Sequence, residues 1–140
     1  MKYFFKTKHS LALAVILFLC VACSRQQSIN NLRVEMRTNP VGVDIQQPRF
    51  SWQIVSNMRN VNQTAYQIMV AKSPYKLKEG KDLVWNSGKV KSSNSILIPY
   101  GGEPLVSRAR YYWKVKVWTK EGGSITSEPG KCFQVFVGKF

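Results

Sequence analysis

The mature part of the sequence predicts an all-β fold, a β-sandwich of about seven strands. From Leu32 onward, short segments in which apolar and polar residues alternate are separated by Gly, Pro and Asn turn signals. Such segments at about ten-residue spacing are typical of sandwiches and barrels, and helical periodicity is almost absent. Hydrophobic residues make up 44% of the 140-residue chain, which is enough for one core but leaves no room for a second domain.

We expect strands where this alternation is clearest and turns where Pro or Gly interrupts it. The segments 49–55 and 64–72 are expected to pair with each other. Between 73 and 80, Leu77 among Lys and Glu residues indicates a turn or a single helical turn. The expected strands are 32–38, 49–55, 64–72, 83–86, 95–98, 110–120 and a last one around Phe133, Val135 and Val137.

The core is predicted from the inward-facing positions of these strands. In the segment 110–120, the odd-numbered residues from 111 to 117 are apolar and belong in the core. Leu105 precedes Tyr111 by six residues, the spacing of a tyrosine corner, which ties a Greek-key connection to the next strand through the tyrosine hydroxyl. On the opposite face, Tyr112 and Trp118 are candidates for an interface or for stacking on sugar rings. The predicted core centres on Trp52, Tyr66, Leu105, Tyr111 and Trp113.

The N-terminal residues have the pattern of an export signal. Lys2, Lys6 and Lys8 precede an unbroken apolar run over 11–19. This run is too short for a transmembrane helix and is typical of a cleavable signal peptide. We therefore expect the domain to lie outside the cytoplasm.

The stretch LCVACS at 19–24 resembles a bacterial lipobox, in which Cys23 would be the lipidated residue. A lipid there would make the membrane a partner of the chain. The expected division is then 1–22 signal peptide, 23–30 tether and 31–138 sandwich. The alternative is a plain secretory signal cut before Cys23, which would leave that residue as a free thiol.

Two further expectations follow from the leader. No acidic cluster follows Cys23, which favours the periplasmic face of a membrane, with the cell surface as the alternative. If Cys20 leaves with the leader and Cys23 is acylated, Cys132 is the single remaining thiol. No intrachain disulfide is therefore expected.

The charge of the chain is strongly positive, with 21 Lys and Arg against 7 Asp and Glu and a formal net charge of +14. Such a balance raises nucleic acid, anionic lipid and acidic glycan as partners. The cations are, however, scattered singly or alternate with apolar residues, and no Arg-rich block or recognition helix occurs. We therefore expect no nucleic-acid binding.

Residue types that carry chemistry are scarce. His9 is the single histidine and belongs to the leader, which removes the usual general base and the commonest metal ligand from the mature chain. No nucleotide-binding or nucleophile motif occurs in a suitable context, so no catalytic residue, cofactor or metal site is expected. Glu35 is expected at an exposed strand position, and the other carboxylates are expected in solvated loops: Asp44, Glu79, Asp82, Glu103, Glu121 and Glu128.

Several motifs together give the chain a family resemblance. The aromatic residues of the expected core and the tyrosine corner resemble a fibronectin type III domain, without the two cysteines of a classical immunoglobulin bridge. More narrowly, seven motifs resemble, in the same order, the N-terminal sandwich of bacterial α-L-rhamnosidases. They are LRVE at 32–35, NPVGVD at 39–44, PRFSW at 48–52, QTAYQI at 63–68, WNSGKV at 85–90, YYWKV at 111–115 and SEP at 127–129.

This resemblance implies a non-catalytic module rather than an enzyme. The family's inverting hydrolases carry their acid and base carboxylates in a helical barrel several hundred residues further on, and this sequence contains nothing of that barrel. Residues after Pro129 depart from the family pattern, so we expect a truncated chain. The implied partners are adjacent glycosidase domains, with Tyr112, Trp118 and the last strand at the interface. The alternatives are a carbohydrate-binding module and an envelope adhesion or scaffold lipoprotein.

Overall fold

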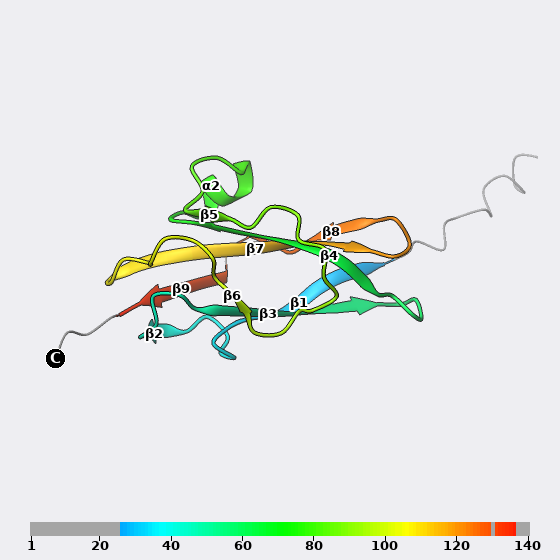
Figure 1. Ribbon diagram of the computed structural model, residues 1–140, viewed down its shortest axis with the longest axis horizontal. Helices are drawn as coiled ribbons and strands as arrows, with labels where there is room; N and C mark the ends of the chain where they lie inside the picture. Colours follow the sequence, from blue (N-terminus) through cyan, green and yellow to red (C-terminus); the bar gives the residue numbers. More distant parts are fainter. Residues whose placement is uncertain (1–25, 130, 137–140) are drawn as a thin grey trace, which may run out of the picture.

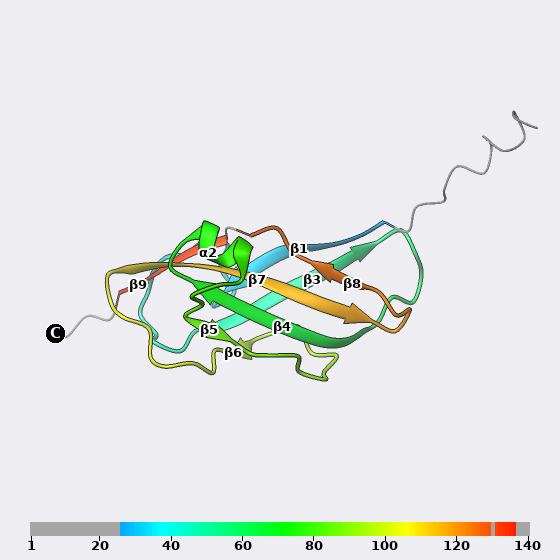
Figure 2. The ribbon, with the colours of Figure 1, turned by 90° about the horizontal axis from the view of Figure 1, so that it is seen from above.

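The alternating segments form two β-sheets that pack face to face in the computed structural model, which describes residues 26–129 and 131–136 (Figures 1 and 2). The smaller sheet has the strand order β1-β3-β6, and the larger has β2-β9-β7-β4-β5 with β8 paired to β7. The expected immunoglobulin-like sandwich is confirmed. The elements are β1 Gln27–Val34, β2 Val41–Val43, β3 Arg49–Ser56, β4 Gln63–Ala71, α2 Pro74–Glu79, β5 Trp85–Asn86, β6 Ile98–Pro99, β7 Ala109–Thr119, β8 Ser124–Thr126 and β9 Lys131–Val135.

The strands β3 and β4 do not pair with each other, and the expectation that they would was wrong. β3 pairs with β1 and β6, whereas β4 pairs with β7 and β5. The connection 57–62 is longer than the usual hairpin loop of about two to five residues, and it carries the chain from one sheet to the other. As a result, the rings of Trp52 and Tyr66 meet across the core, edge to face, with centroids 5.3 Å apart.

The first strand begins earlier than the sequence pattern indicates. β1 starts at Gln27, inside the segment expected to be a tether, and Ile29 on it is only 7% exposed. The register shifts between Asn30 and Arg33, so the apolar residues do not alternate regularly and the pattern hid the strand. β1 ends at Val34, where two successive residues, Glu35 and Met36, have φ values of 48° and 63° and turn the chain out of the extended conformation.

The short strands were the hardest to predict. β2 lies in a segment expected to be a loop and pairs in parallel with β9, and β8 follows the turn after β7. The strand expected at 95–98 is reduced to Ile98–Pro99. Each has two or three residues, too few to show a period of two.

The core lies between the sheets, and all five residues predicted for it are at most 9% exposed. The tyrosine corner is present, because the Tyr111 hydroxyl accepts a hydrogen bond of 2.9 Å from the backbone N–H of Val106. Gln63 is buried beside the core, and its side-chain oxygen accepts a 3.0 Å hydrogen bond from Trp52 Nε1. This bond joins the two sheets directly.

A second, smaller cluster forms where α2 covers one part of the outer face of the larger sheet (Figure 1). The Ser73 hydroxyl caps the helix by accepting a hydrogen bond from the N–H of Lys76, and Gly80 ends it with a φ of 69°. Leu77 is fully buried against Met69 and Ala71. The single helical turn expected between 73 and 80 is therefore this helix.

The described chain enters and leaves the sandwich at opposite ends of its long axis (Figures 1 and 2). β1 begins at one end, and β9 ends at the other beside β2. No helix in the described ranges is long and apolar enough to cross a membrane. The expected signal peptide, Cys23 and Val137 lie outside the described residues, as does the side chain of Cys132.

Candidate functional site

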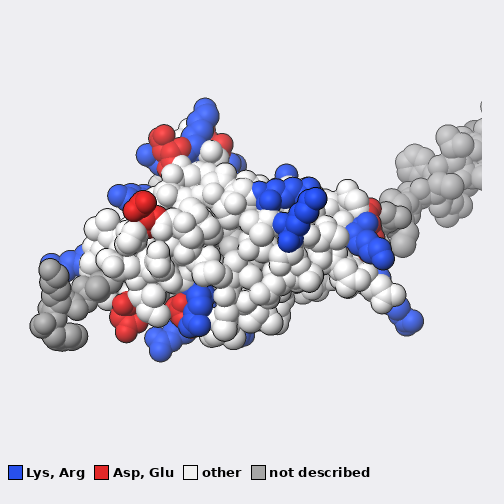
Figure 3. Space-filling model, viewed as in Figure 1, with Lys and Arg blue, Asp and Glu red and all other residues white. Residues whose placement is uncertain are grey.

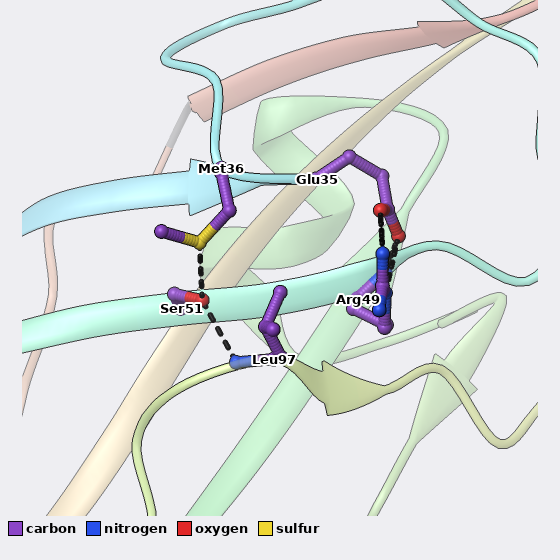
Figure 4. A network of polar contacts seen from close by, with 5 residues as sticks. All are labelled: Glu35, Met36, Arg49, Ser51 and Leu97. Carbon is purple, nitrogen blue, oxygen red and sulfur yellow. Dashed lines mark hydrogen bonds and ion pairs between the residues drawn. The ribbon is translucent and has the colours of Figure 1, made fainter.

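Two of the family-like motifs meet at an ion pair where β1 ends and β3 begins (Figure 4). Arg49 Nη2 lies 2.6 Å from Glu35 Oε2, and Arg49 Nε lies 3.1 Å from Glu35 Oε1. The backbone N–H of Arg49 also donates to Glu35 Oε1 at 2.6 Å. The side chain of Glu35 is only 15% exposed, so the expectation of an exposed position was wrong.

This arrangement fits a structural carboxylate rather than a catalytic acid. Hydrogen bonds from Arg49 hold the pKa of Glu35 below its ordinary value of 4.5. A general acid of a glycosidase needs the opposite shift, which keeps it protonated near neutral pH. Glu35 therefore fixes the turn after β1 against β3.

Ser51 extends this network across the outer face of the smaller sheet (Figure 4). Its hydroxyl accepts a 2.9 Å hydrogen bond from the N–H of Leu97 and donates to the sulfur of Met36 at 3.8 Å. A shallow groove of about 350 Å³ runs beside it, with Met36 and Ile96 among its apolar lining and Gln53 among its polar lining. The groove is lined by no carboxylate and no histidine.

The remaining carboxylates do not gather into a site. All six that were expected in solvated loops are exposed. Among the described residues, no group of three or more His, Cys, Asp and Glu side chains could hold a metal ion.

Tyr112 and Trp118 both lie on the outer face of β7, but the structure separates them. Tyr112 packs beside Leu77 in the cluster under α2. Trp118 lies six residues further along the strand, where its ring has the ammonium groups of Lys89 and Lys116 at 4.4 Å and 5.1 Å from its centroid. The two rings therefore lie apart on the same face, and Tyr112 is partly covered by the cluster under α2.

Large exposed apolar side chains gather instead at the end where the described chain leaves the sandwich. We call Val41, Ile45, Val106 and Phe136 the exit-end patch; they are 80%, 41%, 62% and 41% exposed. Backbone hydrogen bonds tie their segments together, from Phe136 to Val43, from Leu105 to Gln46 and from Arg108 to Val135. These bonds place the segments that carry the four exposed apolar residues side by side, which makes this end of the sandwich a candidate contact surface.

Comparison with known proteins decides the family. A family model described as Rha78A-like, N-terminal immunoglobulin domain matches residues 29–135. The chain belongs to this family. The matched range starts within β1 and ends at the last residue of β9, so the family's domain and the observed sandwich coincide.

The proteins and the solved structure to which this immunoglobulin domain is similar are α-L-rhamnosidases. An α-L-rhamnosidase of Formosa agariphila is 38% identical over 96% of this chain, and one of Streptomyces avermitilis is 45% identical over 65% of it. A crystal structure of the Streptomyces avermitilis α-L-rhamnosidase complexed with L-rhamnose superposes with a TM-score of 0.74, at 39% identity over 79% of this chain. The chain spans 14%, 9% and 11% of these three proteins, respectively.

Sequence reasoning found the family and missed the features that the fold creates. Glu35 and Arg49 both belong to family-like motifs, yet nothing in the sequence pattern shows that they pair. The exit-end patch was missed because its members lie on three separate segments. Val41, Val43 and Ile45 stand in a segment for which no strand was expected, and these apolar residues were the one available signal.

Proposed function

We propose that this immunoglobulin domain is the non-catalytic N-terminal module of an α-L-rhamnosidase, and that it acts by packing against the domain that follows it. The observation that carries the proposal is the exit-end patch. The patch lies at the end of the sandwich where β9 ends. The module is about a tenth of the length of the α-L-rhamnosidases that it matches, so the next domain of such an enzyme would follow from this end.

The patch has the composition expected of a contact between domains. Val41 and Val106 are small β-branched residues that lose little side-chain freedom when they are covered, and Phe136 adds a large apolar ring. Interfaces between domains of one chain bury roughly 600–1,500 Å², and four clustered apolar side chains are a reasonable centre for such an area. The interface is accordingly proposed here, beyond the last strand, and not at Tyr112.

Among the other exposed apolar residues, Met36 and Ile96 line the groove on the smaller sheet, and Tyr75 and Val55 are less suited to this role. Tyr75 projects from α2, and Val55 lies near the end at which the chain enters. Neither is held beside other large exposed apolar groups by backbone hydrogen bonds. Val55 therefore provides a matched control for substitutions at Val41 and Val106.

A chimeric enzyme tests the proposed function. Residues 26–136 would replace the corresponding segment of the Formosa agariphila relative, and hydrolysis of a chromogenic α-L-rhamnoside would be followed. We expect no hydrolysis by this chain alone and near-parental hydrolysis by the chimera. Hydrolysis by the chain alone, or full activity and thermal stability of a relative from which the segment has been deleted, would contradict the proposal.

We further propose that the module is held at the extracytoplasmic face of a membrane by a lipid on Cys23. The charged and apolar regions of the leader and the lipobox-like stretch support this. Metabolic labelling with an alkyne fatty acid should mark the wild-type chain and leave Cys23→Ala unlabelled. Equal labelling of both proteins would exclude this anchor, and an unlabelled but secreted wild-type chain would indicate a plain signal peptide.

A further inference from the structure

The geometry around Trp118 points to a second surface, a binding site for oligosaccharides that carry uronic acid carboxylates. We define this Trp118 site by Trp118, Lys89, Lys114 and Lys116, on the outer face of the larger sheet. The choice of a glycan among anionic ligands rests on the proposed function, whereas the geometry of the site does not.

The indole of Trp118 lies over the sheet. In the pairing of β4 with β7, Trp118 is the register partner of Ala65. The neighbouring Tyr66 belongs to the core, so the methyl group of Ala65 points to the outer face. Ala65 is nevertheless only 2% exposed. Trp118 is the large side chain placed to cover it, and its ring is half-buried as a result.

Two lysines approach this ring from different parts of the chain. Lys116 lies two residues before Trp118 on β7, and Lys89 comes from the segment after β5 whose Val90 bridges to Tyr66. Their Nζ atoms lie 5.1 Å and 4.4 Å from the ring centroid, within the range of cation–π contacts. An anion beside the ring would therefore meet both ammonium groups.

These cations lack acidic partners in the described part of the chain, where the ion pairs are Arg49–Glu35 and Lys76–Asp82. Figure 3 shows Lys and Arg atoms gathered over the region of β4 and β8, with the visible Asp and Glu atoms elsewhere. Lys114 lies two residues before Lys116 on the same face of β7, and partial burial lowers its pKa. A carboxylate bound there would offset the cost of desolvating that ammonium group.

A uronate ring uses both parts of the site. In the free protein both ammonium groups lie over the indole, so a pyranose that stacks on the ring takes their place there, and the displaced lysines pair with its carboxylate. A single-stranded nucleic acid would require successive aromatic platforms, but the other aromatic of this face, Tyr112, lies within the cluster under α2. A membrane would require apolar groups that project from the surface, whereas Trp118 lies against the sheet.

The test compares two ligands that differ only in their carboxylates. A short cello-oligosaccharide and the same oligosaccharide oxidised at C6 to its uronic acids would be titrated into the folded chain, with indole fluorescence and calorimetry as readouts. We expect binding of the oxidised ligand alone, weakened about tenfold or more by Trp118→Ala and by the pair Lys89→Gln and Lys116→Gln. The control pair Lys78→Gln and Lys81→Gln, which removes the same charge near α2, should change affinity less than twofold.

Because Trp118 covers Ala65, Trp118→Phe would be measured beside Trp118→Ala, and thermal unfolding would show that each variant is folded. Equal binding of the neutral ligand, equal losses in the control pair, or tighter binding of single-stranded DNA or anionic vesicles would each overturn the Trp118 site. The chimera's hydrolysis and unfolding do not involve these residues. Absence of ligand binding at the Trp118 site would therefore leave the proposed packing function intact. Independent unfolding of the module in the chimera would likewise not change the binding result.

Discussion

The hydroxyl groups of two buried tyrosines, Tyr111 and Tyr100, are expected to contribute differently to the stability of the domain. The Tyr111 hydroxyl holds the Val106 N–H at 2.9 Å, whereas the Tyr100 hydroxyl has no hydrogen-bond partner in the described part of the chain. Burial raises the pKa of Tyr100 to about 12. Both rings are at most 2% exposed, so replacement by Phe would isolate the effect of the hydroxyl in each case.

We expect Tyr111→Phe to lower the free energy of unfolding by about 1 kcal/mol, the usual net value of one hydrogen bond. Tyr100→Phe should leave it unchanged or raise it, because the removed group is buried without a partner. Urea unfolding followed by tryptophan fluorescence measures both. A larger loss for Tyr100→Phe than for Tyr111→Phe would contradict the assignment of the tyrosine corner.

Glu35 gives the domain a pH-dependent contribution to stability. Its pKa is lowered in the folded state by Arg49, so the stabilisation is present above the ordinary value of 4.5 and is lost as the pH falls through the folded value. Glu35→Gln should therefore cost about 1–2 kcal/mol near neutral pH and progressively less in acid. Exposed Glu128→Gln serves as the control, and a deficit for Glu35→Gln that does not shrink on acidification would show that the ion pair contributes nothing.

At the scale of elements, Gln63 holds together parts that belong to different sheets. Besides accepting from Trp52, its amide nitrogen donates to the carbonyls of Ser92 and Asn94 at 3.0 Å and 2.8 Å. β3, β4 and the segment before β6 are thus joined through one side chain. The sequence gives no sign of this, because Gln63 lies at the boundary of a polar turn.

Gln63→Ala should lower the free energy of unfolding by about 2–3 kcal/mol, since it leaves several partly buried polar groups without partners. Gln67→Ala is the matched control, because Gln67 makes one exposed hydrogen bond, to Asn86. Urea titrations of the two variants give the comparison. Equal effects at the two positions would mean that the bonds of Gln63 to the neighbouring segments are replaced by water at no cost.

The strands that could be predicted from the sequence are those long and regular enough to show their period. β3, β4 and β7 were expected within a residue or two of their ends, because each has eight or more residues and carries large apolar side chains at alternate positions. β1 was displaced by its irregular register, and β2 and β8 were too short to be detected. The pattern could not predict which strands pair, because alternation shows that one face of a strand is buried but not which strands lie beside it.

At the scale of the whole molecule, the candidate surfaces depended on contacts that no local pattern contains. Trp118 was predicted as an exposed aromatic, but its relation to Lys89 arises only when the segment after β5 folds beside β4. The exit-end patch likewise joins the ends of β2 and β9 with the loop before β7. Family membership could be predicted because motif order is a property of the sequence, whereas surfaces are assembled from distant segments.

The exit-end patch is also expected to couple the unfolding of the module to that of the enzyme that contains it. If Val41 and Val106 are covered by the following domain, the two domains should unfold together, because their shared interface stabilises both. Val41→Ser and Val106→Ser together should uncouple them, while Val55→Ser, a substitution of the same kind near the other end, should not.

Calorimetric unfolding of the chimeric enzyme therefore tests the central claim most directly. We predict one cooperative transition that includes the module for the chimera and for its Val55→Ser variant. For the variant with Val41→Ser and Val106→Ser, we predict a separate module transition several degrees lower. A module that unfolds independently in the unaltered chimera, at a temperature that the exit-end substitutions do not change, would contradict the account.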